Sequence, residues 1–252
     1  MSTSPVAADD RTAPDGRQRS PGPRQLLASS VSIVRRLPGM AVTTWRWTRS
    51  TALVTRSVID CEGTPPAPDG DRPFPGDEAS LLRRTQGRGR TYRRLYAVVV
   101  DDARVGPQEL VSRLLVDPNR ASPTEVATFE AVSRDRAPGA EFAVRMPGPW
   151  DAPVRVVERT ETSFRLATLR GHMEAGEIEF RASDAPGGRL LFEIESWTRS
   201  GDRLFDLLYD KVPLAREMQL HMWTQFCEAA VRMAGGTAPE GVTVTTWRWP
   251  RG

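Results

Sequence analysis

A regular alternation of apolar and polar residues marks positions 189–198 as a strand. Four alternate residues fall on one side and two glutamates fall on the other: Leu190, Phe192, Ile194 and Ser196 against Glu193 and Glu195. This period of two is typical of a strand with one buried face. The polar residues 199–202 that follow indicate a turn.

The longest helical pattern in the chain comes next, at 213–234. Asp210 and Pro213 suit a helix start, because proline in the first turn needs no backbone donor, and Gly235 and Gly236 suit the end. At about 100° per residue, the apolar side chains form one wide stripe. The stripe contains Leu214, Met218, Met222, Phe226, Ala229 and Met233, and it is widened by Leu220, Trp223, Cys227 and Val231. Such a wide stripe predicts a helix that is covered on most sides.

The residues between 92 and 182 contain one shorter helix pattern and six further strand patterns. The strands are expected at 92–100, 125–133, 140–146, 154–158, 163–169 and 177–182, and the helix at 106–116. Apolar residues share one face of these strands and charged residues share the other, which is typical of an antiparallel sheet with one solvated side. We therefore predict an α+β fold in which a curved seven-stranded antiparallel sheet wraps around a long C-terminal helix.

These patterns divide the chain into five parts. We expect a disordered tail at 1–25, a basic amphipathic helical extension at 26–60, a Pro/Gly-rich linker at 61–90, a folded domain at 91–236 and a C-terminal tail at 237–252. The hexapeptide Val-Thr-Thr-Trp-Arg-Trp occurs twice, at 42–47 and at 244–249. Two copies do not make a repeat protein, so the match is either a docking element shared by both termini or an accident of composition.

The extension at 26–60 combines amphipathic helical patterns with a bias toward positive charge. Between Gly16 and Ile59 there are eight arginines and no acidic residue. One interpretation is a helix pair on an anionic membrane surface, with tryptophans and arginines at headgroup depth. The candidate membrane-surface residues are Arg35, Arg36, Trp45, Arg46, Trp47 and Arg49. The alternative is a helical extension that packs on its own domain or on a second copy of the chain.

Composition narrows the classes of function. The chain of 252 residues has a formal net charge of only +3 and a single lysine, Lys211, so we expect no nucleic-acid partner. Cys61 and Cys227 suggest neither a disulfide framework nor a metal site, and we predict no metal and no cofactor. No stretch reads as a secretory signal or an uninterrupted membrane span, so we expect a cytoplasmic location, with membrane association through the extension as the alternative. The oligomeric state is left open by the sequence.

Three stretches resemble a known family. They are Met146-Pro-Gly-Pro-Trp-Asp-Ala-Pro-Val-Arg-Val, the run 164–180 around Gly171-His172, and Phe192-Glu-Ile-Glu-Ser-Trp. They are similar to bacterial proteins of the domain-of-unknown-function 1990 family, which falls in the START-like (SRPBCC) superfamily of lipid-transfer domains and polyketide cyclases. The resemblance covers residues 92–234 and implies a helix-grip fold with an internal cavity. It implies no activity and no catalytic residues.

His172 is the principal candidate for chemistry. It lies in a glycine-containing connection at a strand end, where loops often border a cavity, so it can act as a general base or contact a ligand, with Glu174 as an accompanying carboxylate. An imidazole in a surface loop is the plainer interpretation. His221 lies four residues after Glu217 on the polar side of the long helix, and this spacing predicts a solvated ion pair.

Glu193 and Glu195 form a second pattern that is relevant to catalysis. Strand geometry places them about 7 Å apart on one face, a separation that glycosidases use. Arg155, Arg165 and Arg181 can pair with them across the strands of the outer face. We therefore interpret the two carboxylates as members of solvated ion pairs.

The leading functional hypothesis is the non-catalytic binding of a hydrophobic small molecule or lipid between the sheet and the long helix. The candidate contact residues are Trp150, His172, Phe180, Ile194, Ser196, Tyr209, Met218, Met222 and Phe226. A filled core is the plainer interpretation of the apolar members. Two other functions are a cyclase- or hydrolase-type enzyme that uses His172, and a membrane-surface scaffold that acts through the extension.

Overall fold

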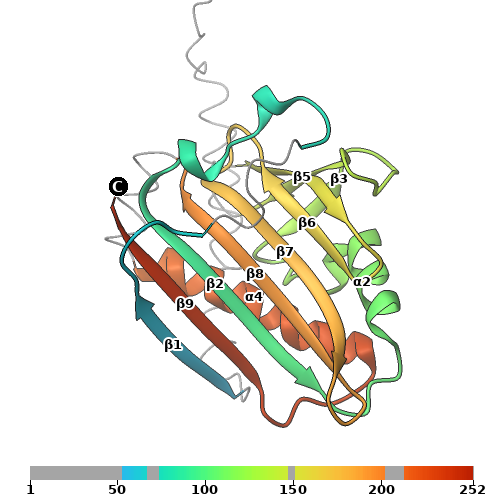
Figure 1. Cartoon of the computed structure of the whole chain (residues 1–252). Helices are drawn as coiled ribbons and strands as arrows, with labels where there is room; N and C mark the ends of the chain where they lie inside the picture. The colour runs from blue at the N-terminus through green and yellow to red at the C-terminus, as the bar shows by residue number, and fades with distance from the viewer. Residues whose placement is uncertain (1–52, 67–73, 147–150, 202–212, 252) are drawn as a thin grey trace, which may run out of the picture.

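The computed structural model describes residues 53–66, 74–146, 151–201 and 213–251 (Figure 1). In this part of the chain it shows an α+β fold with one mixed sheet of nine strands and two α-helices. The strands are β1 (Val54–Asp60), β2 (Arg88–Val100), β3 (Thr128–Ala131), β4 (Glu141–Arg145), β5 (Asp151–Arg159), β6 (Ser163–Thr168), β7 (Glu174–Ala185), β8 (Arg189–Ser200) and β9 (Val242–Arg251). The α-helices are α2 (Pro107–Val116) and α4 (Pro213–Ala234), and the connections contain the 3-10 helices η1 (Glu78–Ser80), η2 (Arg84–Gln86) and η3 (Pro118–Arg120).

Most of the sheet is a chain of antiparallel neighbours. The strand order is β1-β9-β2-β8-β7-β6-β5-β4-β3, so β3 through β8 pair in the order in which they occur in the sequence. Strand β9 inserts between β1 and β2, antiparallel to β2 and parallel to β1. The two ends of the described chain therefore lie side by side at one edge of the sheet.

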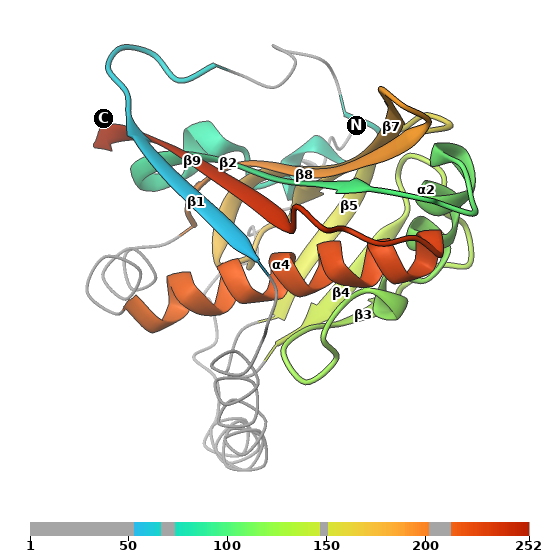
Figure 2. The same ribbon diagram turned by 90° about the horizontal axis from the view of Figure 1, so that it is seen from below.

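The sheet curls around α4, which crosses its concave face (Figure 2). Helix α4 packs against β2, β8 and β9, and its last part contacts α2. Aromatic side chains from both layers meet in the core: Phe164, Phe180 and Phe192 from the sheet, with Trp223 and Phe226 from α4. Burying one such side chain contributes about 1.5–3 kcal/mol, so this interface is a main source of stability.

The alternation predicted for 189–198 is confirmed by the burial of β8. Leu190, Phe192, Ile194 and Ser196 are all buried on the concave face. Glu193 lies on the convex face, where it pairs with Arg181 of β7. The side of this strand that faces α4 is thus the one that the sequence pattern indicates.

The predicted number of seven strands and the all-antiparallel sheet are wrong. Strands β1 and β9 add to the sheet, and α4 is followed by β9 and is not the last element. Only Val54 of β1 is partly buried and the rest of that strand is exposed, so it carries no apolar alternation. In β9 the alternation fades after Val242 and Val244 into threonine, tryptophan and arginine. The region expected as a C-terminal tail thus contains a strand, as does the end of the expected helical extension.

Residues 74–87, which fall within the expected linker, pack on the convex face. Phe74 and Leu81 contact a small apolar cluster formed by Val157, Ala167 and Leu169. Beside it the buried guanidinium of Arg155 donates to the Asp77 carbonyl oxygen at 2.9 Å and to the Ser80 hydroxyl at 2.8 Å. This segment therefore covers the convex face of β5 and β6.

Gly176 of β7 lies opposite Thr198 of β8, where the backbones approach closely. Its φ is +146°, and an added Cβ would lie 2.0 Å from the carbonyl oxygen of Trp197. We expect Gly176→Ala to lower the free energy of unfolding by about 2–4 kcal/mol, because it combines backbone strain with a clash against main chain. Chemical denaturation followed by circular dichroism measures the loss.

Gly187 in the β7–β8 turn supplies the matched control. Its φ is +79°, and an added Cβ meets nothing within 4 Å. Gly187→Ala should therefore cost only the left-handed backbone penalty of about 1–2 kcal/mol. Equal losses for the two variants would contradict the close approach of β7 and β8 at Gly176.

Candidate functional site

A chain of polar side chains joins α4 to the concave face of the sheet. Arg94 of β2 is 4% exposed, and its Nη1 donates to Oε1 of Gln219 on α4 at 2.7 Å. Nε2 of Gln219 in turn donates to Oε2 of Glu174 on β7 at 2.8 Å. Burying such groups is costly unless they are hydrogen-bonded, and these contacts offset that cost. We call Arg94, Gln219 and Glu174 the polar bridge.

The ionisation of Glu174 depends on this environment. Burial raises the pKa of Glu174, while the charge of Arg94 and the hydrogen bond from Gln219 oppose the shift. The net effect is upward, so the carboxyl group is held closer to its neutral form than an exposed glutamate. A neutral carboxyl group can also donate a hydrogen bond.

His172 lies beside the polar bridge, in the connection that leads into β7. The backbone N–H of Glu174 donates to Nδ1 of His172 at 2.8 Å, so Nδ1 is the acceptor and Nε2 carries the proton of the neutral ring. Burial lowers the pKa of His172 to about 4. The ring therefore bonds to the backbone of Glu174, whereas the carboxyl group of Glu174 accepts from Gln219. This geometry positions a neutral imidazole and does not join it to the carboxylate as an acid–base pair.

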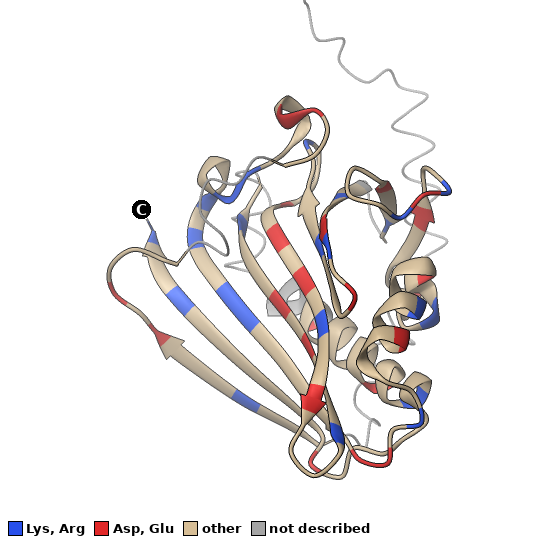
Figure 3. Cartoon of the chain, turned by 45° about the vertical axis from the view of Figure 1, so that its right-hand side comes forward, with Lys and Arg blue, Asp and Glu red and all other residues tan. Residues whose placement is uncertain are grey.

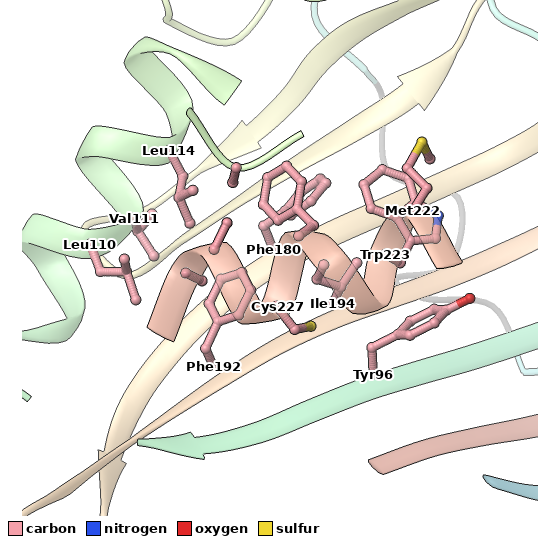
Figure 4. Close-up of a cluster of buried hydrophobic side chains, with 14 of the residues drawn as sticks. Tyr96, Leu110, Val111, Leu114, Phe180, Phe192, Ile194, Met222, Trp223 and Cys227 are labelled. Carbon is pink, nitrogen blue, oxygen red and sulfur yellow. The ribbon is translucent and has the colours of Figure 1, made fainter. Parts of the chain in front are cut away.

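Aromatic rings fill the adjacent part of the helix–sheet interface (Figure 4). Phe180 stacks on Phe164 with ring centroids 4.7 Å apart, and Trp223 lies 5.6 Å from Phe180 and 5.7 Å from Phe226. Nε1 of Trp223 is buried and has no hydrogen-bond partner within the described residues. A buried indole N–H usually finds a partner, so this donor is an exception within an otherwise apolar cluster.

Several of the predicted contact residues meet at this interface. Phe180, Ile194, Ser196, Met222 and Phe226 are all buried. They come from β7, β8 and α4, and His172 lies at the start of β7.

Other predicted residues lie outside what the structure describes. Trp150 and Tyr209 lie outside the described residues, as does the side chain of Met218. The same holds for the candidate membrane-surface residues Arg35, Arg36, Trp45, Arg46, Trp47 and Arg49. A membrane surface as a partner therefore stays a prediction from the sequence.

Sequence reasoning missed the polar bridge. Arg94 shares its strand face with Tyr92, Tyr96, Val98 and Val100, and period-two counting alone places it on the concave side. An arginine between apolar residues of one face was the available signal. The sequence contains no comparable signal for Gln219, because a glutamine near the edge of a wide apolar stripe is ordinary on a helix.

A family model described as a domain of unknown function (DUF1990) matches residues 94–229. The match begins at Arg94, ends within α4 and spans more than half of the 252 residues. The chain belongs to the DUF1990 family. The family resemblance found in the sequence is thereby confirmed, and the polar bridge lies entirely within the matched DUF1990 region. No curated protein matches the chain.

Solved structures with similar folds share little sequence with this DUF1990 protein. A conserved protein from Geobacillus kaustophilus is 12% identical to this chain, with a TM-score of 0.42. The match covers 57% of this chain and 95% of the Geobacillus chain. The protein titled Ara h 8.0201 is 12% identical with a TM-score of 0.39, covering 56% and 97%. A Thalictrum norcoclaurine synthase point mutant, solved in complex with a transition-state analogue, is 10% identical with a TM-score of 0.39, covering 57% and 94%.

The convex face of the DUF1990 domain explains the paired carboxylates Glu193 and Glu195. Nη1 of Arg181 lies 2.7 Å from Glu195, and Nε of the same arginine lies 2.9 Å from Glu193. Arg93 also pairs with Glu195. Acidic and basic positions lie near one another on adjacent strands of the sheet (Figure 3). The ion-pair interpretation is confirmed for Arg181, whereas Arg155 pairs with Glu141 and Arg165 pairs with Glu158 and Glu177. Glu195 is buried within the network and is not solvated.

The predicted ion pair between His221 and Glu217 is wrong. His221 is buried, whereas Glu217 pairs with Arg56 of β1 at 3.1 Å. Burial lowers the pKa of His221, opposed by the charge of Glu125. The polar side of α4 is therefore partly covered, and the sequence pattern alone did not reveal it.

Two further searches were restricted to the described residues. Within them, no group of three or more His, Cys, Asp or Glu side chains is arranged to hold a metal ion. Neither described helix combines the length and apolar character that crossing a lipid bilayer requires.

The depressed pKa of His172 predicts a pH dependence of stability. The unfolded chain binds a proton on this ring near pH 6.5 and the folded chain only near pH 4, so stability should fall as the pH drops through this window. Because His172 as a whole residue is only half-buried, the loss between pH 7 and pH 4.5 should be about 1–2 kcal/mol. Urea unfolding at both pH values, compared with His172→Gln, measures it.

In His172→Gln the side-chain oxygen can still accept from the backbone N–H of Glu174, but nothing titrates there. The variant should lose less stability than the wild type over the same pH interval. Glu174→Gln supplies a check of opposite sign, because the raised pKa of Glu174 contributes stability that is lost as the pH rises. If His172→Gln loses as much stability as the wild type between pH 7 and pH 4.5, then His172 is not the group that causes the loss.

Proposed function

We propose that this DUF1990 domain binds a hydrophobic small molecule or lipid between α4 and the concave face of the sheet, without catalysis. The observation that carries the proposal is the buried Nε1 donor of Trp223, which lacks a partner within the described residues and lies among aromatic rings. An unsatisfied buried donor costs about 1–3 kcal/mol. A ligand with an acceptor atom would satisfy it.

The surroundings of Trp223 support the same function. Ligand sites in proteins are lined mainly by apolar and aromatic side chains, with a few well-placed polar groups that fix orientation. Phe180 and Phe226 supply the apolar surface near Trp223, and Ser196 and Arg94 supply buried polar groups on the concave face. Met222, on the same helix, has an unbranched side chain that adapts to irregular shapes.

The geometry gives less support to an enzyme that uses His172. A general base works best with a pKa near the working pH, and the pKa of His172 is lowered to about 4. Its Nδ1 is occupied by the backbone of Glu174. Binding without chemistry is therefore the function that we carry forward.

We expect the full-length chain to bind the uncharged dye 1-N-phenylnaphthylamine in the micromolar range, because burial of its rings against Phe180 and Phe226 excludes water. Fluorescence titration measures the affinity. Native mass spectrometry of the freshly purified protein should also show an added mass that is lost on denaturation. A chain that binds no dye and carries no added mass would overturn the proposal.

Substitutions on opposite faces of β8 locate the site. Ile194 is fully buried toward α4, so Ile194→Phe or the smaller change Ile194→Met should weaken dye binding, the larger side chain by at least about tenfold. Leu191 lies on the convex face of the same strand, so Leu191→Phe should leave dye affinity unchanged. Circular dichroism confirms that each variant is folded. Equal effects of Ile194→Phe and Leu191→Phe would place the dye elsewhere.

A further inference from the structure

The concave face changes from apolar to polar along the direction of the strands. One row across the sheet consists of Val244, Tyr96, Ile194, Phe180 and Phe164. Two residues further along, the next row consists of Thr246, Arg94, Ser196, Ile178 and Leu166. The row beyond it contains Arg248, Tyr92, Thr198 and Gly176. Polar groups thus enter on β9, β2 and β8 at one end of the face.

Helix α4 changes in the same direction. The ring centroid of Phe226 lies 5.3 Å from that of Phe180 and 6.5 Å from that of Phe192, so Phe226 lies over the apolar row that contains Phe180. Trp223 lies about one turn earlier in the helix, and Gln219 lies one turn before Trp223. Gln219 bonds to Arg94 and Glu174, which lie at the polar end of the face. Helix and sheet therefore present matched apolar and polar ends to each other.

The polar end carries a fixed positive charge. Arg94 is 4% exposed, and an arginine side chain does not lose its proton in proteins. It stacks over the ring of Tyr92 at 4.9 Å and donates to Gln219, so its position is held from two sides. The nearby carboxyl group of Glu174 is pushed toward its neutral form by burial. The charge balance at this end therefore favours a negative group over a positive one.

We infer that the ligand is an amphipathic anion whose acidic head lies at the polar bridge of Arg94, Gln219 and Glu174 and whose apolar body lies toward Phe180 and Phe226. This inference rests on the proposed function and specifies the class of ligand. A carboxylate and a phosphate share the required chemistry, since both accept hydrogen bonds from a guanidinium. A neutral head of the same chain length would lose the attraction to Arg94, and a cationic head would be repelled.

Displacement of 1-N-phenylnaphthylamine from the full-length chain tests the inference. The competitors share one alkyl chain and differ in the head: dodecanoate, dodecyl phosphate, dodecanol and dodecyltrimethylammonium, each used below its critical micelle concentration. At least one of the anions should displace the dye at a concentration at least about tenfold lower than dodecanol, a factor worth ~1.4 kcal/mol. The order of the two anions identifies the head as carboxylate or phosphate. The cation should compete least.

Neighbouring arginines on β2 supply a matched pair of variants. Arg94→Gln should reduce the preference for the anion over dodecanol to about twofold or less. The preference is the ratio of the two displacement constants within one variant, so a change in dye affinity cancels from it. Arg93 lies on the convex face, where it contacts Glu195 and Trp247, so Arg93→Gln should keep the full preference. If Arg94→Gln fails to fold, Arg94→Lys, which retains the charge but loses the planar donor pair, should show an intermediate preference.

The outcomes separate this inference from the proposed function. Dye binding without any preference for an anion in the wild-type chain would overturn the inference and leave the proposed function intact. An equal loss of preference in Arg93→Gln and Arg94→Gln would also overturn it, because the effect would then follow total charge. A chain that binds no dye would overturn the proposed function itself.

Discussion

The burial of the apolar side of α4 against a curled sheet is the interaction on which the rest of this DUF1990 domain depends. Trp223, Phe226 and Cys227 of the helix meet Phe180, Phe192 and Ile194 of the sheet with almost no exposed surface. A sheet that bends toward a helix covers more of the helix surface than a flat sheet does. The curl of the strands, the position of α2 at the end of α4 and the location of buried polar groups all follow from that contact.

The two faces of the sheet balance charge differently. On the convex face, arginines and glutamates of adjacent strands form a network. Arg181 contacts three carboxylates, those of Glu179, Glu193 and Glu195. Arg165 lies close to the carboxylates of Glu158, Glu177 and Glu179, the last of which it shares with Arg181. On the concave face, Arg94 is linked to Glu174 through the amide of Gln219. Ion pairs between neighbouring strands stabilise the sheet, whereas an uncharged amide that accepts from a guanidinium does not neutralise its charge. This difference supports the concave face as the location of the proposed ligand site.

Sequence patterns predicted the elements that obey a simple period. The strands from 92 to 198 and the inward side of β8 followed from alternation, because large apolar residues recur at every second position, as Leu190, Phe192 and Ile194 do in β8. Strands β1 and β9 were not predicted from alternation. Strand β1 is almost wholly exposed, and β9 mixes threonine with tryptophan and arginine. Their pairing therefore depends on tertiary contacts that the local sequence does not encode. The candidate site was predictable in its apolar members, such as Phe180 and Phe226. The polar bridge was not, because Arg94, Glu174 and Gln219 lie on three separate elements and only the fold brings them together.

The parallel pairing of β1 with β9 also bears on how the molecule is assembled during translation. Ser57 and Thr245 touch across this pair although they are separated by 188 positions in the sequence. A ribosome releases the N-terminal strand long before it has made the strand beside which that segment finally rests. Closing so large a loop is slow relative to forming neighbouring hairpins. The edge that contains β1 can therefore form only after β9 has been synthesised.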